Sequence, residues 1–135
     1  MAFGGQANGF DVAMDAKIPI GKESAPTPKE LVALGLGGCT AMDVIALLKK
    51  YKMLPKSFRV DVDIQTSTGV QPAVFEKAFL DFVVEGDVDP AKLIEAVSLS
   101  QTKFCGVSAM LAKAHPIEYR IVLNGHEIGK GSARF

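Results

Sequence analysis

The sequence predicts an α+β domain in which a mainly antiparallel sheet packs against two helices. Three features predict it: a long apolar run over residues 30–50, two later runs with apolar residues at every second position, and a second helical pattern that begins at residue 89. The expected order of elements is strand, helix, strand, strand, helix, strand. No linker or internal repeat divides the 135 residues, so a single domain is expected.

The first helix is predicted over about residues 28–51. Thr27 and Glu30 form a capping-box pattern, with Pro28 at the first helical position. The apolar run that follows is typical of a helix buried all round, and its polar side chains are Cys39, Thr40 and Asp43. Three glycines precede the cysteine: Gly35, Gly37 and Gly38. Either another backbone packs closely there, or the helix bends.

The later elements follow from periodicity. Residues 58–65 alternate strictly and predict a half-buried strand. Residues 73–85 are apolar on both faces, which indicates a central strand or one covered by a second subunit. A helix of about 15 residues is predicted from Asp89-Pro90 to an interruption at Cys105-Gly106, and a last strand over residues 117–123. Residues 10–14 are a weak strand candidate, whereas residues 1–9 and 124–135 are expected to be irregular.

Composition excludes several classes of function. The formal net charge is zero, which argues against a general binder of nucleic acid or membrane surfaces. The longest apolar run is interrupted by Asp43 and glycines, so no membrane span is expected. No secretory signal is visible, and a cytoplasmic location is expected. Two cysteines 66 positions apart have neither disulfide-scaffold nor zinc-type spacing, and neither a metal nor a cofactor is expected.

Three segments carry a resemblance to a known family: two motifs that contain the cysteines and the strand–strand–helix segment between them. The first is Pro26-Thr27-Pro28-Lys29-Glu30-Leu31 leading to Gly37-Gly38-Cys39-Thr40-Ala41, and the second is Leu99 to Ser108, which contains a Cys-x-x-Ser motif. In this order, separated by a strand–strand–helix segment, they resemble the OsmC/Ohr family of thiol-dependent peroxidases that act on organic hydroperoxides. The resemblance covers about residues 10–123. The sequence around Cys39 is most similar to an OsmC-like branch distinct from the well-studied peroxidases.

The resemblance implies an intertwined homodimer with active sites at the subunit interface, in an enzyme of the oxidative stress response. Cys39 would attack the peroxide and become a sulfenic acid, and Cys105 would condense with it to a disulfide. A dithiol reductant, such as a lipoylated protein, would restore the pair. A disulfide requires Cα atoms about 4.4–6.8 Å apart, so the two cysteines are expected to lie close together.

The sequence also departs from the family pattern. The studied peroxidases have a glutamate ten residues before the first cysteine, in contact with an arginine from the N-terminal strand region. Lys29 occupies that position here, and Glu30 follows it. The first arginine is Arg59, and Gln6 is nearest to the family's arginine position. The chain starts about ten residues later than the family pattern, so a first strand is expected to be absent. The device that activates the thiolate is therefore absent or replaced.

Both thiols could instead have only a packing role, since a buried free cysteine usually behaves as a small hydrophobic residue. Cys105 lies where a helix restarts, with Ser108 three residues later, and local physics alone would make it the more acidic thiol. The resemblance nevertheless assigns the nucleophile to Cys39. Asp43 follows Cys39 by one helical turn. It either orients the site or has a structural role, with a partner helix, Lys29, Arg59 or Lys103 as its partner.

Glu30 is most simply a cap. In an unbroken helix it lies about 13 Å from Cys39, so it reaches the site only if the helix bends or if it faces the other subunit. The substrate pocket is expected to be lined by Leu36, Met42, Phe104 and Ser108. Three functions remain open: an organic hydroperoxide reductase, a dimeric redox-sensing or small-molecule-binding protein without efficient turnover, and a structural interaction domain.

Overall fold

The structure is a computed structural model that describes all 135 residues. The chain divides into two compact units, residues 1–34 and residues 35–135, which are described separately.

The first unit contains a β-hairpin of strands β1 (Ala2–Ala7) and β2 (Phe10–Asp15), which pair antiparallel. The turn is formed by Asn8 and Gly9, both with positive φ (50° and 83°). Asn-Gly favours such a two-residue turn because its backbone twist matches that of the paired strands. The weak strand at residues 10–14 is thus confirmed. The expectation that residues 1–9 are irregular is wrong, because this turn pairs them with β2.

The loop after β2 is organised by the carboxylate of Asp15. It accepts hydrogen bonds from the Ser24 hydroxyl (2.7 Å) and from the backbone N–H groups of Ser24, Ala16 and Lys22 (3.0, 2.8 and 3.1 Å). These bonds, those from Ser24 first, hold the pKa of Asp15 far below its usual range. One carboxylate therefore satisfies several loop N–H groups that no strand or helix would satisfy.

Helix α1 (Pro28–Lys50) is one unbroken helix, as predicted, so the bend considered at the glycines is wrong. The capping box is also confirmed: Thr27 N–H donates to Glu30 Oε2 at 2.8 Å, and Glu30 N–H donates to Thr27 Oγ1 at 3.2 Å. By length and composition alone, α1 could cross a membrane, contrary to the expectation from sequence. The core helix of a folded domain meets the same criterion.

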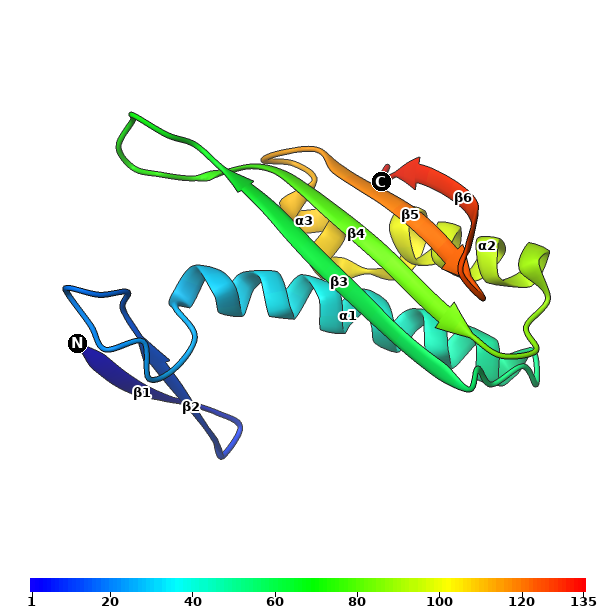
Figure 1. The fold of residues 1–135 in the computed structure, drawn as a ribbon, viewed down its shortest axis with the longest axis horizontal. Coiled ribbons are helices and arrows are strands. Elements are labelled where there is room, and N and C mark those ends of the chain that lie inside the picture. Colours follow the sequence, from blue (N-terminus) through cyan, green and yellow to red (C-terminus); the bar gives the residue numbers. More distant parts are fainter. The chain divides into compact units, whose positions relative to one another are not determined.

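The second unit is built on a four-stranded sheet, seen in Figure 1, with the order β3 (Ser57–Thr66), β4 (Phe75–Glu85), β5 (Ile117–Leu123) and β6 (His126–Ser132). β4 is a central strand, as predicted. The β3–β4 and β5–β6 pairs are antiparallel, whereas β4 and β5 are parallel because a helical crossover joins them. The irregular tail expected after residue 124 is wrong: Asn124 and Gly125 form a second turn with positive φ, and β6 follows.

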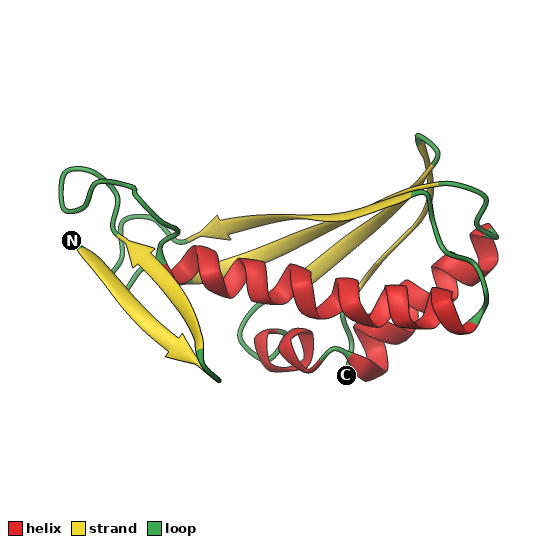
Figure 2. Ribbon diagram, turned by 90° about the horizontal axis from the view of Figure 1, so that it is seen from below, coloured by secondary structure: helices red, strands yellow, loops and turns green.

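The crossover contains α2 (Pro90–Leu99), a π-helical turn (Ser100–Phe104) and the short helix α3 (Gly106–Leu111). Asp89 caps α2 by accepting from Ala91 N–H at 2.8 Å, as the sequence predicted. The predicted interruption at Cys105 is also confirmed, because this residue has an extended backbone (ψ 100°). Figure 2 shows the helices on one face of the four-stranded sheet.

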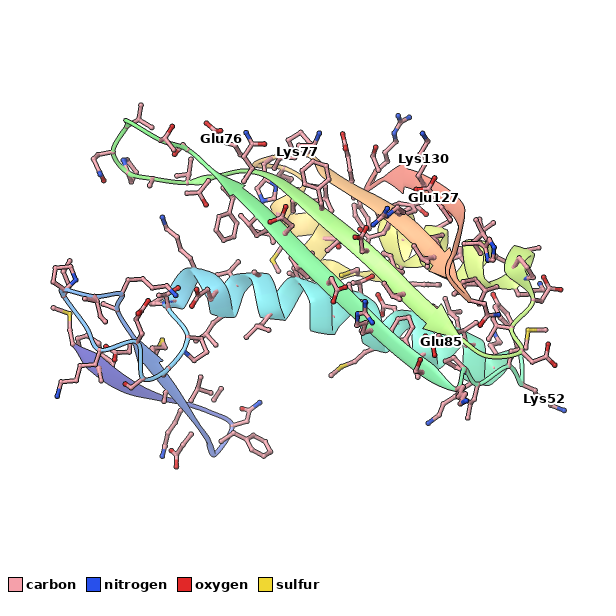
Figure 3. All side chains as sticks on the ribbon, in the orientation of Figure 1. Lys52, Glu76, Lys77, Glu85, Glu127 and Lys130 are labelled. Atoms are coloured by element: carbon pink, nitrogen blue, oxygen red, sulfur yellow. The ribbon has the colours of Figure 1, made fainter.

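The core lies between this sheet face and the helices. Its fully buried apolar side chains include Leu36, Val44, Leu48, Leu80, Phe82, Leu93 and Val97. The opposite sheet face is polar and bears a hollow of about 490 Å³, lined by sheet residues such as Asp81, Arg120, Glu127 and Lys130. Figure 3 labels Glu127 and Lys130 on β6. Neither cysteine lines this hollow.

Candidate active site

The structure brings the two cysteines together. Cys39 lies in the middle of α1 and is partly exposed, whereas Cys105 lies between the π-helical turn and α3 and is fully buried. Both are free thiols. Burial is the main cause that raises the pKa of the Cys105 thiol, and the neighbouring Cys39 side chain raises it further. Two residues 66 positions apart in sequence thus become neighbours.

Burial dominates the electrostatics of Cys105. Its Sγ accepts a hydrogen bond from Ser108 N–H at 3.3 Å, in the position of the α3 N-cap. Burial is the largest influence and raises the pKa of the thiol, while the hydrogen bond from Ser108 N–H opposes it. The expectation that the helix start makes Cys105 acidic is therefore not supported, because burial outweighs the hydrogen bonds. The few N–H groups at the start of this six-residue helix do not compensate for the loss of water.

A buried chain of polar side chains lies next to the thiols. Gln101 Nε2 donates to Thr40 Oγ1 at 2.8 Å, and the Thr40 and Ser100 hydroxyls are hydrogen-bonded at 2.7 Å. The Ser100 hydroxyl donates to Asp43 Oδ2 at 3.0 Å. Thr40, Ser100 and Gln101 are fully buried. The chain joins α1 to the π-helical turn.

This chain was missed in the sequence. A signal was present, because Thr40 is a polar side chain in a run predicted to be buried, and a buried hydroxyl needs a partner. The partners Ser100 and Gln101 lie 60 and 61 positions away. Only the packing of the π-helical turn against α1 identifies them, and no periodicity in the sequence shows that turn.

The Asp43 carboxylate accepts a hydrogen bond from a neutral group, the Ser100 hydroxyl. Two of the cations expected as its partners have other neighbours. Arg59 Nε donates to Asp61 Oδ2 at 3.0 Å, and the Lys103 ammonium lies 5.6 Å from the ring centroid of Phe104.

Glu30 is engaged at the start of α1. Besides its bond from Thr27, its carboxylate lies 3.0 Å from the Lys17 ammonium. The Thr27 N–H and then Lys17 hold the pKa of Glu30 below its ordinary value. At the position nearest to the family's arginine, Gln6 donates to the Asp11 carboxylate at 2.8 Å. Both residues therefore have local structural partners within the first unit.

The four expected pocket residues have different environments. Leu36 is fully buried in the core and is not accessible to a substrate, so its expected pocket role is not supported. Met42 and Phe104 are 75% and 47% exposed. Ser108 is fully buried beside Cys105. No group of three His, Cys, Asp or Glu side chains is arranged to hold a metal ion.

A long helix that brings one thiol to a second thiol at a helix start, over one face of a mixed sheet, defines an α+β protein with a paired-cysteine site. The chain belongs to the OsmC-like protein family, whose model matches residues 21–120. Protein YhfA of Escherichia coli strain K12 is 34% identical over 115 residues, which cover 82% of this chain and 81% of that protein. The resemblance noted in the sequence is thus confirmed.

Solved structures confirm the α+β fold. An OsmC-like protein from Mycoplasma pneumoniae superposes with a TM-score of 0.78 at 13% identity, covering 90% of this chain and 88% of that one. An organic hydroperoxide resistance protein OsmC from Legionella pneumophila gives a TM-score of 0.65 at 14% identity, covering 90% and 95%. At these identities the likeness is one of fold.

Proposed function

We propose that this protein is a thiol peroxidase that reduces organic hydroperoxides through Cys39 and Cys105. The observation that carries the proposal is the pairing of a partly exposed thiol with a fully buried one. A nucleophile must reach the peroxide, and only Cys39 combines exposure with a neighbouring thiol. Cys105 is suited to the second step, because it needs to reach only Cys39.

The proposed catalytic cycle passes through a sulfenic acid and then a disulfide. The Cys39 thiolate attacks the terminal oxygen of the hydroperoxide, the O–O bond breaks, and an alcohol leaves after it takes up a proton. Cys39 is then a sulfenic acid. The Cys105 sulfur attacks the Cys39 sulfur, a disulfide forms, and the hydroxyl leaves as water. A dithiol, either small or carried on a lipoylated protein, reduces the disulfide and is itself oxidised to a disulfide.

The proposal includes a homodimer. Met42 is 75% exposed on α1, and Phe104 and Met110 are 47% and 65% exposed near the second cysteine. Large apolar side chains that a single chain leaves in water are typical of an interaction surface. A second copy over this surface would also enclose Cys39 in an apolar environment, which favours alkyl hydroperoxides over hydrogen peroxide.

A second candidate is a redox sensor in which the same pair forms a disulfide without efficient turnover. It is favoured by the absence of an arginine before Arg59 and by the local engagement of Gln6 with Asp11. The sensor and the enzyme share the oxidation of Cys39 by the peroxide. They differ in how fast a dithiol reduces the disulfide again.

The test is consumption of cumene hydroperoxide in the presence of a dithiol, with wild type, Cys39→Ser and Cys105→Ser in parallel. We expect turnover by the wild type, none by Cys39→Ser, and a sulfenic acid on Cys39 that dimedone traps in Cys105→Ser. Stoichiometric oxidation without turnover would favour the sensor. Equal consumption by Cys39→Ser would reject the assignment of the nucleophile.

A further inference from the structure

The hydrogen-bond chain of Gln101, Thr40, Ser100 and Asp43 has a defined direction. Ser100 has one hydroxyl hydrogen, which it donates to the Asp43 carboxylate. The 2.7 Å contact between the Thr40 and Ser100 hydroxyls therefore uses the Thr40 hydrogen. Thr40 in turn accepts from Gln101 Nε2. Each hydroxyl donates once and accepts once, and the chain ends on an acidic side chain, which polarises it from end to end.

The hydrogen-bond chain also connects the backbones of the two cysteines. Thr40 follows Cys39 directly in α1. The Ser100 carbonyl accepts a hydrogen bond from the N–H of Cys105 at 2.9 Å, five residues back along the π-helical turn. One side-chain bond of 2.7 Å and one backbone bond of 2.9 Å thus connect the peptide after Cys39 to the peptide of Cys105.

The π-helical turn explains why Ser100 can have both roles. In this turn the N–H of Cys105 reaches back to Ser100 rather than to the residue four positions before it. The wider turn ends at Cys105, and the Ser100 hydroxyl is bonded to α1. Such turns are rare and are frequent at functional sites.

We propose that Thr40, Ser100 and Asp43 are positioning residues that fix Cys39 against Cys105 and so promote disulfide formation between them. This inference deepens the proposed function and rests on it for its biological meaning. A thiol pair held in place behaves as if each thiol saw the other at high effective concentration. Removing a link of the hydrogen-bond chain lets α1 and the π-helical turn move relative to each other. The effective concentration of one thiol at the other then falls.

The test is a disulfide equilibrium that needs no peroxidase activity. The reduced protein is equilibrated with reduced and oxidised glutathione, quenched with acid, and analysed by mass spectrometry. The two cysteine thiols lose two electrons and two protons to form the disulfide, and oxidised glutathione takes them up to become two reduced molecules. The ratio of disulfide to dithiol gives the effective concentration of the pair.

Thr40→Val and Ser100→Ala are expected to lower this effective concentration about tenfold, which corresponds to the loss of one or two buried hydrogen bonds. Thr40→Ser keeps the hydroxyl and is expected to have the wild-type effective concentration. Asp43→Ala changes the half-buried end of the hydrogen-bond chain and is the variant least expected to disturb folding. It is expected to lower the effective concentration by a smaller factor.

The matched control is Ser67→Ala. Ser67 is also a buried serine whose hydroxyl is hydrogen-bonded, because it accepts from Val74 N–H at 2.9 Å, but it lies in the β3–β4 connection. Its loss is expected to leave the effective concentration unchanged. An unchanged value in Thr40→Val, Ser100→Ala and Asp43→Ala, or an equal fall in Ser67→Ala, would overturn the positioning role.

The peroxidase assay separates this inference from the proposed function. If the wild type does not turn over but the chain variants lose effective concentration, the proposed function fails and the positioning role stands. If the wild type turns over and the variants keep the wild-type disulfide equilibrium, the reverse holds.

Discussion

The two faces of α1 differ in exposure far more than in composition. On one face, Leu36, Val44 and Leu48 are fully buried against the sheet and the other helices. On the other face, Met42 is 75% exposed and Ala46 is also exposed. Cys39 is partly exposed, between these extremes. A helix that is apolar all round is thus buried by its own chain on one side only, and Cys39 lies where that burial ends.

The largest effect should follow from emptying the buried face. Leu48→Ala is expected to lower the free energy of unfolding by about 2–5 kcal/mol, because it removes apolar contacts and leaves a cavity. Leu54→Ala, at a leucine that is 60% exposed, should change it by less than about 0.5 kcal/mol. Denaturant titration of both variants measures the difference. Equal losses would show that exposure in the single chain does not describe the assembled protein.

The exposed face should respond in association rather than in folding. Met42→Lys is expected to weaken self-association about 100-fold or more, because a desolvated ammonium in an apolar interface costs several kcal/mol. Sedimentation velocity over a range of concentrations measures this, with Leu54→Lys as the control for added charge. If Met42→Lys keeps the wild-type mass at every concentration, a second copy does not cover this face.

A single methyl group should show how closely the buried face packs. A Cβ added at Gly37 would lie 2.8 Å from Val62 Cγ2, so Gly37→Ala is expected to cost about 1–3 kcal/mol of stability. Val62→Ala removes the clashing atom. The double variant should therefore be more stable than the sum of the two single effects predicts. Additive losses would place the cost elsewhere than in this contact.

Local patterns predicted the elements that periodicity describes well. The capping box at Thr27, the alternation in β3 and the cap at Asp89 were all confirmed. β1 and β6 were missed because their own residues are polar or small. Asn8-Gly9 and Asn124-Gly125 were the available signals, since both dipeptides adopt positive φ.

The candidate site was predictable only in part. The resemblance to the OsmC/Ohr family implied that Cys39 and Cys105 meet, but burial reversed the expected acidity of Cys105. Leu36 was expected in a pocket and lies in the core, since the apolar run does not show which face of α1 meets the sheet. The desolvation of Cys105 and the face of α1 that meets the sheet both depend on long-range packing. Local residue types do not predict that packing.

The smallest expected effect concerns the pH dependence of stability at Cys105. Burial raises the pKa of this thiol in the folded protein, while the unfolded chain has the ordinary value of about 8.5. The folded state therefore holds the proton more tightly. The associated stability is complete below about pH 8.5 and is lost as the pH rises toward the folded pKa, with a slope of at most about 1.4 kcal/mol per pH unit.

Cys105→Ser replaces the thiol with a hydroxyl that does not titrate in this range. Under reducing conditions, the stability difference between wild type and Cys105→Ser should shift steadily against the wild type from about pH 8.5 to 9.5, as measured by denaturant titration at each pH. Lysines and tyrosines titrate in both proteins, so the difference isolates the thiol. Parallel curves would mean that Cys105 ionises as readily folded as unfolded. Burial would then be no reason to assign the resolving step to Cys105 and the attack to Cys39.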